Sequence, residues 1–348
     1  MSEDFFDRWA VVSYHDDTGL GRLASMFSKV LGLGRHLFVQ SERLADNETV
    51  PGFHVPLSPE ANVDELKSVL DGLQGLIFLE RPNWHPDLAR VAREAGLTTV
   101  CVPMWEWFRS EAPQWSDFDS LFCCSGITFD VVSKLTKTPC HQITLPFEIE
   151  SLPIRSVNGP GRLFIHNAGL VDESDRKGTA DTIRAFSRVK RPDIKLVLRM
   201  QKPADLPKGD DRVEIRIGNL PNHADLYSEG DVAIQPSKME GLGFSVMEPF
   251  SCGIPVITTD YPPMNEHVGD QRMLVKPRWG KRKAYATTWV PQAHLRIPQT
   301  SDLARKIEWC AENDLSEISA SNRMIAVERY DPSRIRAEWK LALEALRQ

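Results

Sequence analysis

Short apolar runs alternate with longer amphipathic stretches along the whole chain, a pattern typical of α/β proteins with parallel sheets. The first apolar runs predict strands over residues 9–14, 36–40, 75–80, 98–103 and 120–125. The amphipathic stretches between them predict helices over residues 20–31, 62–73 and 86–96. A stretch rich in Pro, Gly and Ser follows at residues 145–161 and is typical of a linker.

The alternation of strands and helices starts again after this linker. Apolar runs predict strands over residues 162–168, 194–200, 213–218, 231–237 and 255–260, and residues 178–190 predict a helix. We therefore expect two Rossmann-like, doubly wound domains, residues 1–150 and 151–331, that face one another across a cleft. Residues 332–348 predict a last helix that packs back on the first domain. Ligands of such sheets bind at the carboxyl ends of the strands.

Composition narrows the class of protein. The chain has 348 residues, of which 41% are hydrophobic and 26% charged, as in globular proteins that bury a large core. It has no apolar run long enough to span a membrane and no export signal at its start, so we expect a cytoplasmic protein. Six cysteines show no metal-binding spacing, and we expect them to be reduced.

Charge differs between the two expected domains. Residues 1–150 contain 12 Lys and Arg against 22 Asp and Glu, whereas residues 151–348 contain 30 against 26. Because opposite charges attract, this distribution favours the second domain as the place for an anionic ligand.

The segment Glu240–Glu248, "EGLGFSVME", concentrates candidate chemistry in that second domain. Glu240 follows a predicted buried strand, and a helix is predicted to begin near Phe244. The N-terminus of a helix offers backbone N–H groups to an anion such as a diphosphate. The two carboxylates then lie where they can bind hydroxyl groups at either end of that anion. The pattern thus indicates a site for a nucleotide sugar.

The stretch "PSKMEGLGFSVMEPFSCGIPVITTD" resembles the Glu-x7-Glu signature of retaining glycosyltransferases with the GT-B fold, the glycogen-synthase-like superfamily. The resemblance implies that Glu240 contacts the donor sugar and Glu248 the ribose. It also implies that the amides of Gly241, Leu242, Gly243 and Phe244 meet the diphosphate of a nucleotide-sugar donor. Members of this family bind the donor without a metal or other cofactor.

The family also uses a basic residue before the first helix of its donor domain. Arg176 and Lys177 occupy this place, and Lys177 matches the family's Lys-Gly pair. The family's Gly-Arg pair after the preceding strand is replaced by "HNAG", and Arg176 is the candidate to substitute for it. The segment that frames the nucleobase in the family corresponds to residues 216–227, with Gly218 and Asn219 as its expected backbone contacts.

The first domain offers less specific candidates. Gly19 and Gly21 in "TGLG" let the backbone approach the donor or form an ordinary tight turn, and the neighbouring Asp16 and Asp17 contact an acceptor or cap the following helix. Many family members carry a His after the fourth strand. The sequence there is "VPMWEWF", so Glu106 is one candidate for its role and His85 another.

One basic stretch stands apart from these motifs. Residues 276–289 include Lys276, Arg278, Lys281, Arg282 and Lys283, with Trp279 and Tyr285 among them. We expect a solvated loop, and the alternative is a surface that binds an anionic acceptor through phosphate contacts and aromatic stacking.

Together these features predict a retaining glycosyltransferase that moves a sugar from a nucleotide diphosphate to an acceptor hydroxyl by front-face displacement. A small molecule or glycan is favoured as the acceptor. One alternative is transfer to a polymer such as hydroxymethylated DNA, through the basic stretch 276–283. Another is a non-catalytic module that binds nucleotide sugars, which the departures from the family's Gly-Arg and His leave open.

Overall fold

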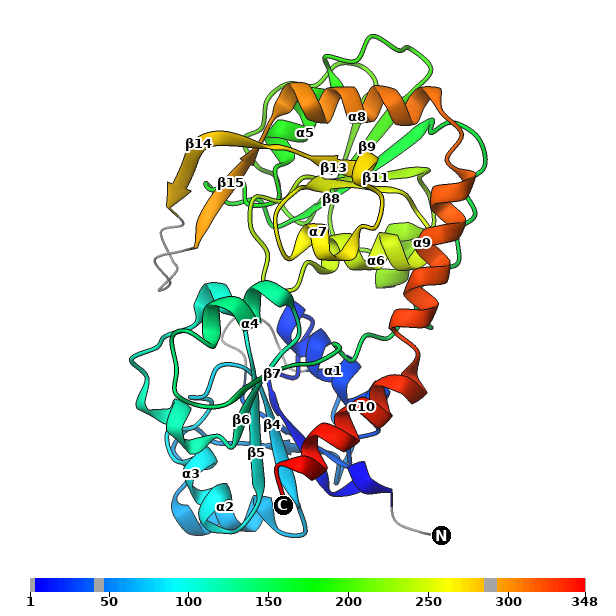
Figure 1. Cartoon of the computed structure of the whole chain (residues 1–348). Helices are drawn as coiled ribbons and strands as arrows, with labels where there is room; N and C mark the ends of the chain where they lie inside the picture. Colours follow the sequence, from blue (N-terminus) through cyan, green and yellow to red (C-terminus); the bar gives the residue numbers. More distant parts are fainter. Residues whose placement is uncertain (1–3, 41–46, 285–292, 348) are drawn as a thin grey trace. The chain divides into compact units, whose positions relative to one another are not determined.

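A computed structural model describes residues 4–40, 47–284 and 293–347, with side chains left out of the description at 279–284. The chain divides into two compact units. Unit 1 comprises residues 1–148 and 330–348, and unit 2 comprises residues 149–329. Each unit is built around its own parallel sheet (Figure 1).

Seven strands of unit 1, counted over its described residues, form one sheet in the order β3-β2-β1-β4-β5-β6-β7, and every neighbouring pair is parallel. The strands are β1 (Trp9–Ser13), β2 (Arg35–Phe38), β3 (His54–Pro56), β4 (Gly75–Glu80), β5 (Thr98–Pro103), β6 (Ser120–Cys123) and β7 (Cys140–Gln142). The central strands are apolar on both faces, as expected for a sheet covered by helices on each side. The short edge strands β3 and β7 were not predicted from the sequence.

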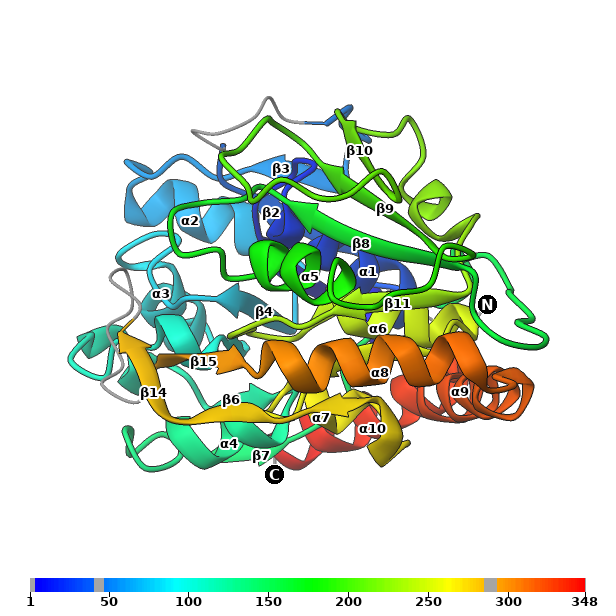
Figure 2. The same cartoon turned by 90° about the horizontal axis from the view of Figure 1, so that it is seen from above.

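Helices cover the two faces of this sheet (Figures 1 and 2). They are α1 (Gly19–Leu31), α2 (Val63–Leu70), α3 (Leu88–Glu94), α4 (Gly126–Val132) and α10 (Pro332–Ala345). The last helix belongs to unit 1, where the buried indole of Trp339 packs between Phe27 of α1 and Phe122 of β6. The Trp339 Nε1 group also donates to the carbonyl of Thr144, 2.8 Å away.

The described part of unit 2 contains a six-stranded sheet in the order β10-β9-β8-β11-β12-β13, again parallel at every pair. Its strands are β8 (Leu163–Gly169), β9 (Lys195–Met200), β10 (Val213–Ile217), β11 (Val232–Gln235), β12 (Val256–Thr259) and β13 (Leu274–Val275). In both sheets the strand order reverses next to the first strand of the unit. Such reversals create the crevice where doubly wound sheets bind ligands.

Helices α5 (Thr179–Phe186) and α8 (Thr300–Glu312) lie on one face of the second sheet (Figure 1). Helices α6 (Phe244–Cys252), α7 (Met264–His267) and α9 (Ser316–Arg329) lie on the other. The sequence predicts a helix over 178–190, but α5 ends at Phe186 and the chain continues into a turn. Across the described residues, none of the helices has the length and apolar character needed to cross a bilayer.

The expectation of a loop over residues 276–289 is wrong for its first part. Pro277–Ala284 form strand β14, which pairs antiparallel with β15 (His294–Pro298). The partner strand β15 buries Leu295 and Pro298, whereas the exposed Lys276 and Arg278 at the start of the stretch obscure any apolar alternation in the sequence. The side chains of Trp279, Lys281, Arg282 and Lys283, and all of Tyr285, lie outside the description, whereas those of Lys276 and Arg278 are exposed.

Replacing Trp339 with Ala should lower the free energy of unfolding of unit 1 by about 3–5 kcal/mol, because a buried indole is lost and a cavity remains. The control is Leu341→Ala in the same helix, since Leu341 is 71% exposed and such surface changes usually stay within about 0.5 kcal/mol. Denaturant titration followed by circular dichroism measures both. Equal small losses in the two variants would contradict the packing of α10 in unit 1.

Candidate functional site

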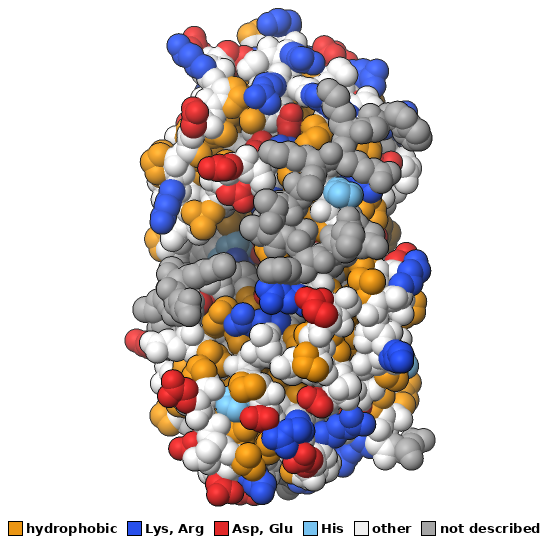
Figure 3. Space-filling view, turned by 90° about the vertical axis from the view of Figure 1, so that its left-hand side faces the viewer, with side chains coloured by type: hydrophobic (Ala, Val, Ile, Leu, Met, Phe, Trp, Pro, Cys, Tyr) orange, Lys and Arg blue, Asp and Glu red, His pale blue; other side chains and the backbone are white. Residues whose placement is uncertain are grey.

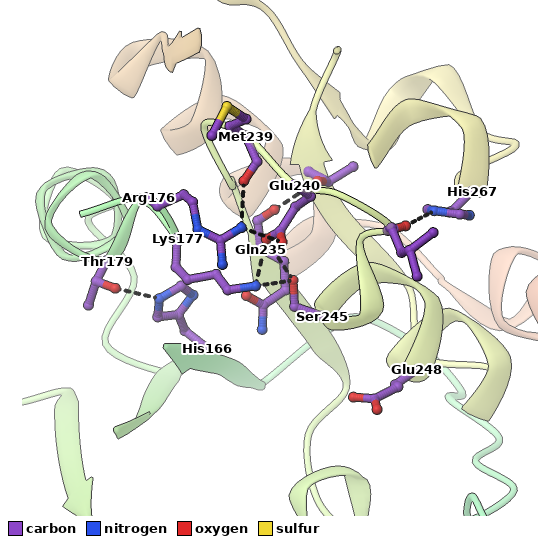
Figure 4. Close-up of polar contacts among 12 residues, drawn as sticks. His166, Arg176, Lys177, Thr179, Gln235, Met239, Glu240, Ser245, Glu248 and His267 are labelled. Carbon is purple, nitrogen blue, oxygen red and sulfur yellow. Dashed lines mark hydrogen bonds and ion pairs between the residues drawn. The ribbon is translucent and has the colours of Figure 1, made fainter. Parts of the chain in front are cut away.

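Glu240 lies just beyond the carboxyl end of β11 and is only 4% exposed. Two cations hold its carboxylate. The Lys177 ammonium is 2.6 Å from Oε1, and the Arg176 guanidinium is 2.9 Å from Oε2. Figure 4 shows both side chains reaching Glu240 from the turn before α5. The sequence placed these residues 63 and 64 positions apart, and the fold brings them into one ion cluster.

The ion cluster controls the protonation of Glu240. Burial raises the pKa of its carboxyl, but the charges of Lys177 and Arg176 outweigh this effect and hold the pKa at about 2. Burial lowers the pKa of the Lys177 ammonium, and the negative charge of Glu240 opposes that shift. Ser245 adds a hydroxyl 3.3 Å from both Lys177 Nζ and Glu240 Oε1. The site is thus a buried, ionised carboxylate between two cations.

A second buried ion pair fixes the turn that carries Arg176 and Lys177. The Lys238 ammonium lies 3.0 Å from Asp175 and 3.2 Å from Asp181. The Asp175 carboxylate accepts bonds from the backbone N–H groups of Thr179 and Ala180, the first residues of α5. This network could not be predicted from the sequence, because its members are charged residues at ordinary positions until the fold brings them together.

Gly178 shows why this turn passes so close to β11. Its φ of +72° is in the left-handed region, and a Cβ at this position would lie 2.5 Å from the carbonyl oxygen of Pro236. A residue with a side chain would therefore be strained by the left-handed backbone and would also clash with Pro236.

The N-terminus of α6 lies next to the ion cluster. The N-cap is Gly243, whose φ is +84°, and the helix begins at Phe244 as predicted. The ring of His267 bonds to the carbonyl of Leu242 at 2.7 Å and supports the Gly241–Gly243 turn from below α6. Burial lowers the pKa of His267 to about 4, so this ring is neutral at physiological pH. A neutral ring adds no positive charge that would repel the positive end of the helix dipole.

Glu248 is also buried, but it lies apart from the cluster around Glu240 (Figure 4). The Tyr227 hydroxyl donates to its Oε2 at 2.5 Å, and His223 Nε2 lies 2.9 Å from its Oε1. Both partners belong to the 3-10 helix His223–Tyr227. Sequence reasoning identified this segment but not these two side chains. No local pattern marks these two side chains in the sequence, because only the fold brings them to Glu248.

Gly218 and Asn219, the predicted nucleobase contacts, are exposed at the end of β10, and Gly218 has a φ of +115°. Gln235, which the sequence did not single out, ends β11 close to Lys177 (Figure 4). It is fully buried, and neither atom of its amide has a hydrogen-bond partner among the described residues.

The candidates in unit 1 cluster at the start of α1. The buried carboxylate of Asp16 accepts bonds from the backbone and hydroxyl of Thr18, the N-cap of α1. A Cβ on Gly21 would lie 2.2 Å from the Asp16 carbonyl oxygen. The turn before α1 therefore requires glycine at this position. A Cβ on Gly19 would meet nothing within 4 Å, and Gly19 and Asp17 are both exposed.

The two candidates for the family's His lie in different settings. His85 is buried, and both of its ring nitrogens bond to backbone, Nε2 with the Ala61 carbonyl and Nδ1 with the Asp87 N–H. Glu106 is buried in the 3-10 helix Trp105–Trp107.

Solved structures with the same overall fold identify that fold. HepE from Anabaena, in complex with UDP and glucose, matches with a TM-score of 0.68 at 12% identity, covering 97% of this chain and 100% of that one. A glycosyltransferase from Rickettsia africae matches with a TM-score of 0.65 at 11% identity over 97% and 98%. A UDP-forming α,α-trehalose-phosphate synthase from Burkholderia xenovorans matches with a TM-score of 0.64 at 10% sequence identity, covering 97% of this chain and 100% of that one. The fold is GT-B.

One part of the sequence matches a known family. Residues 162–289 match the family described as glycosyl transferases group 1, and this range contains Arg176, Lys177, Glu240 and Glu248. The match covers 128 of the 348 residues, so the chain is similar to that family over its second unit. No curated protein matches its sequence.

Replacing Glu240 with Gln should lower the free energy of unfolding of unit 2 at pH 7 by on the order of 3 kcal/mol, because two cations lose their buried counter-charge. The contribution of Glu240 is present above the ordinary carboxyl pKa of 4.5 and is lost as pH falls toward 2. The difference between wild type and variant should therefore shrink below about pH 5. Urea titrations across this pH range measure it, with the exposed Glu173→Gln as control. A difference that does not change with pH would contradict the ionised state of Glu240.

Proposed function

We propose that the protein is a retaining glycosyltransferase that moves a sugar from a nucleotide-diphosphate donor to an acceptor hydroxyl. The observation that carries this proposal is the ion cluster of Arg176, Lys177 and Glu240 beside the N-terminus of α6. Two cations and a helix N-terminus form a setting for a diphosphate. A single buried carboxylate among them can turn to a sugar hydroxyl when phosphate takes over the cations.

The reaction breaks the bond between the sugar's anomeric carbon and the departing phosphate oxygen. The acceptor oxygen forms a new bond to the same face of that carbon, and its proton passes to the departing phosphate. The products are the glycoside and a nucleoside diphosphate. Negative charge grows on the phosphate during this step, so Lys177, Arg176 and the helix dipole stabilise the transition state more than the bound donor.

The second carboxylate fits the other end of the donor. Glu248 has one oxygen on Tyr227 and the other on His223. A carboxylate oxygen has more than one lone pair, so Glu248 can accept bonds from ribose hydroxyls while keeping both partners. Tyr227 and His223 thereby position Glu248 for the ribose, and the backbone at Gly218 and Asn219 is left for the nucleobase.

A UDP-sugar is the first donor to test, because HepE was solved with UDP and glucose and the trehalose-phosphate synthase is UDP-forming. UDP-, GDP-, ADP- and TDP-sugars should each be offered, and release of the nucleoside diphosphate measured. One donor turned over well above the others supports the proposal. Absence of turnover across the panel, with acceptors of several classes present, would contradict it.

We favour a small molecule or glycan as the acceptor over a polyanion such as DNA. Residues 1–150, which form most of unit 1, have 22 acidic against 12 basic residues and would repel a long anion. On the face drawn in Figure 3, the described acidic and basic side chains are interspersed. Proteins that bind nucleic acid backbones instead use runs of basic side chains. In unit 1, Asp16, Asp17 and Glu106 remain the candidates for contact with an acceptor hydroxyl.

Replacing Lys177 with Ala should lower kcat by about 100-fold or more while changing donor affinity much less, because its charge matters most when the phosphate departs. Steady-state kinetics and donor titration calorimetry separate the two effects. Lys190→Ala, an exposed lysine of the same unit, is the control. Weakened donor binding with intact kcat would contradict the assigned role.

Replacing Glu248 with Ala should weaken donor binding by about 1–3 kcal/mol, the size of hydrogen bonds lost by a charged group. The same variant should bind a donor analogue that lacks the ribose hydroxyls as well as the wild type does. Glu308→Ala, at an exposed position of α8, should leave donor binding unchanged. Undiminished donor affinity in Glu248→Ala would remove Glu248 from the ribose site.

A further inference from the structure

Three histidines meet at the β3 edge of the sheet in unit 1. His36 of β2 and His54 of β3 are register partners in neighbouring parallel strands. Side chains of such partners lie on the same face of a sheet. His15 follows β1 by two residues, and its ring lies against both others. One nitrogen from each of the three rings lies within 4.8 Å of the nitrogens from the other two.

The three imidazole rings are in direct contact with one another. The centroids of His15 and His54 are 3.8 Å apart in a stacked arrangement, and the ring of His36 stands edge-on to both at 5.4 and 5.6 Å. Phe38, on the same face of β2 as His36, closes the group on one side. Three basic groups converge in this space, and no acidic side chain is paired with them among the described residues.

A hydrogen bond fixes the tautomer of the His15 ring. Nε2 of His15 lies 3.0 Å from the carbonyl oxygen of Glu48, which can only accept, so Nε2 donates and Nδ1 keeps its lone pair. Nε2 of His36 is buried and has no hydrogen-bond partner among the described residues. A ring nitrogen bonded to a backbone carbonyl, with a lone pair on the other nitrogen, is the arrangement of metal-binding histidines.

His54 is the adaptable member of the group. Its Nδ1 accepts the backbone N–H of Val50, 2.8 Å away. Val50 is 57% exposed, so its N–H group can bond to water when a cation takes this lone pair. His15 and His54 are both half-buried, and this partial exposure gives a cation a way in from solvent.

We propose that His15, His36 and His54 bind a divalent transition metal of the zinc class, with water in a fourth position. Imidazole nitrogens are preferred ligands of such ions, and three of them suffice when water completes the tetrahedron. Tetrahedral zinc with Zn–N bonds of about 2.0–2.1 Å places its ligand nitrogens about 3.4 Å apart. Metal binding requires side-chain rotations that unstack His15 from His54 and turn one nitrogen of each ring toward the ion, from their present separation of 4.8 Å or less. The acidic balance of residues 1–150 adds attraction for a cation.

The metal joins three separate segments of unit 1. His15 belongs to the turn that carries Asp16 and leads into α1, whereas His36 and His54 belong to the sheet. A metal at this point ties the turn to the sheet edge, and so holds Asp16 and the start of α1 in place. This role is structural and is independent of the glycosyl-transfer chemistry proposed for unit 2.

The test uses the full chain without an affinity tag, freed of metal with a chelator and titrated with zinc sulfate by calorimetry. We expect one zinc ion per chain. Titration with cobalt chloride should give the visible absorption of four-coordinate Co²⁺. Zinc should also raise the melting temperature of the wild type, because the three rings converge only in the folded chain, which therefore binds zinc more tightly than the unfolded chain. Absence of zinc binding, or a cobalt spectrum typical of six water ligands, would overturn the proposal.

His54→Phe is the decisive variant, since it keeps the ring stacked on His15 and removes both nitrogens. It should weaken zinc binding by about 100-fold or more, and zinc should no longer raise its melting temperature. His15→Phe should do the same, which keeps the test valid if one variant folds poorly by circular dichroism. His141→Ala, an exposed histidine of β7, is the control. Zinc affinity unchanged in both Phe variants would show that zinc binds elsewhere on the chain.

Discussion

A buried carboxylate held between two cations is the constraint on which the architecture of unit 2 depends. Taking three charges out of water is costly, and mutual attraction offsets that cost only when the geometry is close. Here the geometry is set by bonds of 2.6 and 2.9 Å from Lys177 and Arg176 to Glu240. A second pair, Lys238 with Asp175, fixes the turn that delivers both cations. Because burying these charges costs free energy, we infer that the arrangement serves to bind a charged ligand.

The fold brings Arg176, Lys177 and Glu240 together at the carboxyl ends of β8 and β11. Parallel strands deliver the turns after β8 and β11 to the same edge of the sheet, so residues 176–178 and 237–243 meet there. Two glycines with left-handed backbone, Gly178 and Gly243, let these turns approach their neighbours closely. Helix α6 then starts beside the cluster and adds its dipole to the two cations.

Much of the fold and of the candidate site could be predicted from the sequence. The features that could not be predicted have physical causes. The start of α6 at Phe244 was predictable because glycine and an apolar run mark a helix boundary locally. Lys238, His223 and Tyr227 were not, because their importance comes from partners far along the chain. The basic stretch was interpreted as a loop because its closely spaced charged residues lack the apolar alternation typical of a strand. The three histidines are 39 positions apart at most, on different strands, so no spacing motif marks them.

The account's central claim is that the Arg176–Lys177–Glu240 cluster binds a diphosphate. The most direct measurement is a crystal structure of the chain with a bound nucleoside diphosphate. We predict the terminal phosphate within hydrogen-bond distance of Lys177 Nζ and the Arg176 guanidinium, next to the N-terminus of α6, with Glu248 on the ribose. A diphosphate bound elsewhere, with both ion pairs to Glu240 unchanged, would contradict the account.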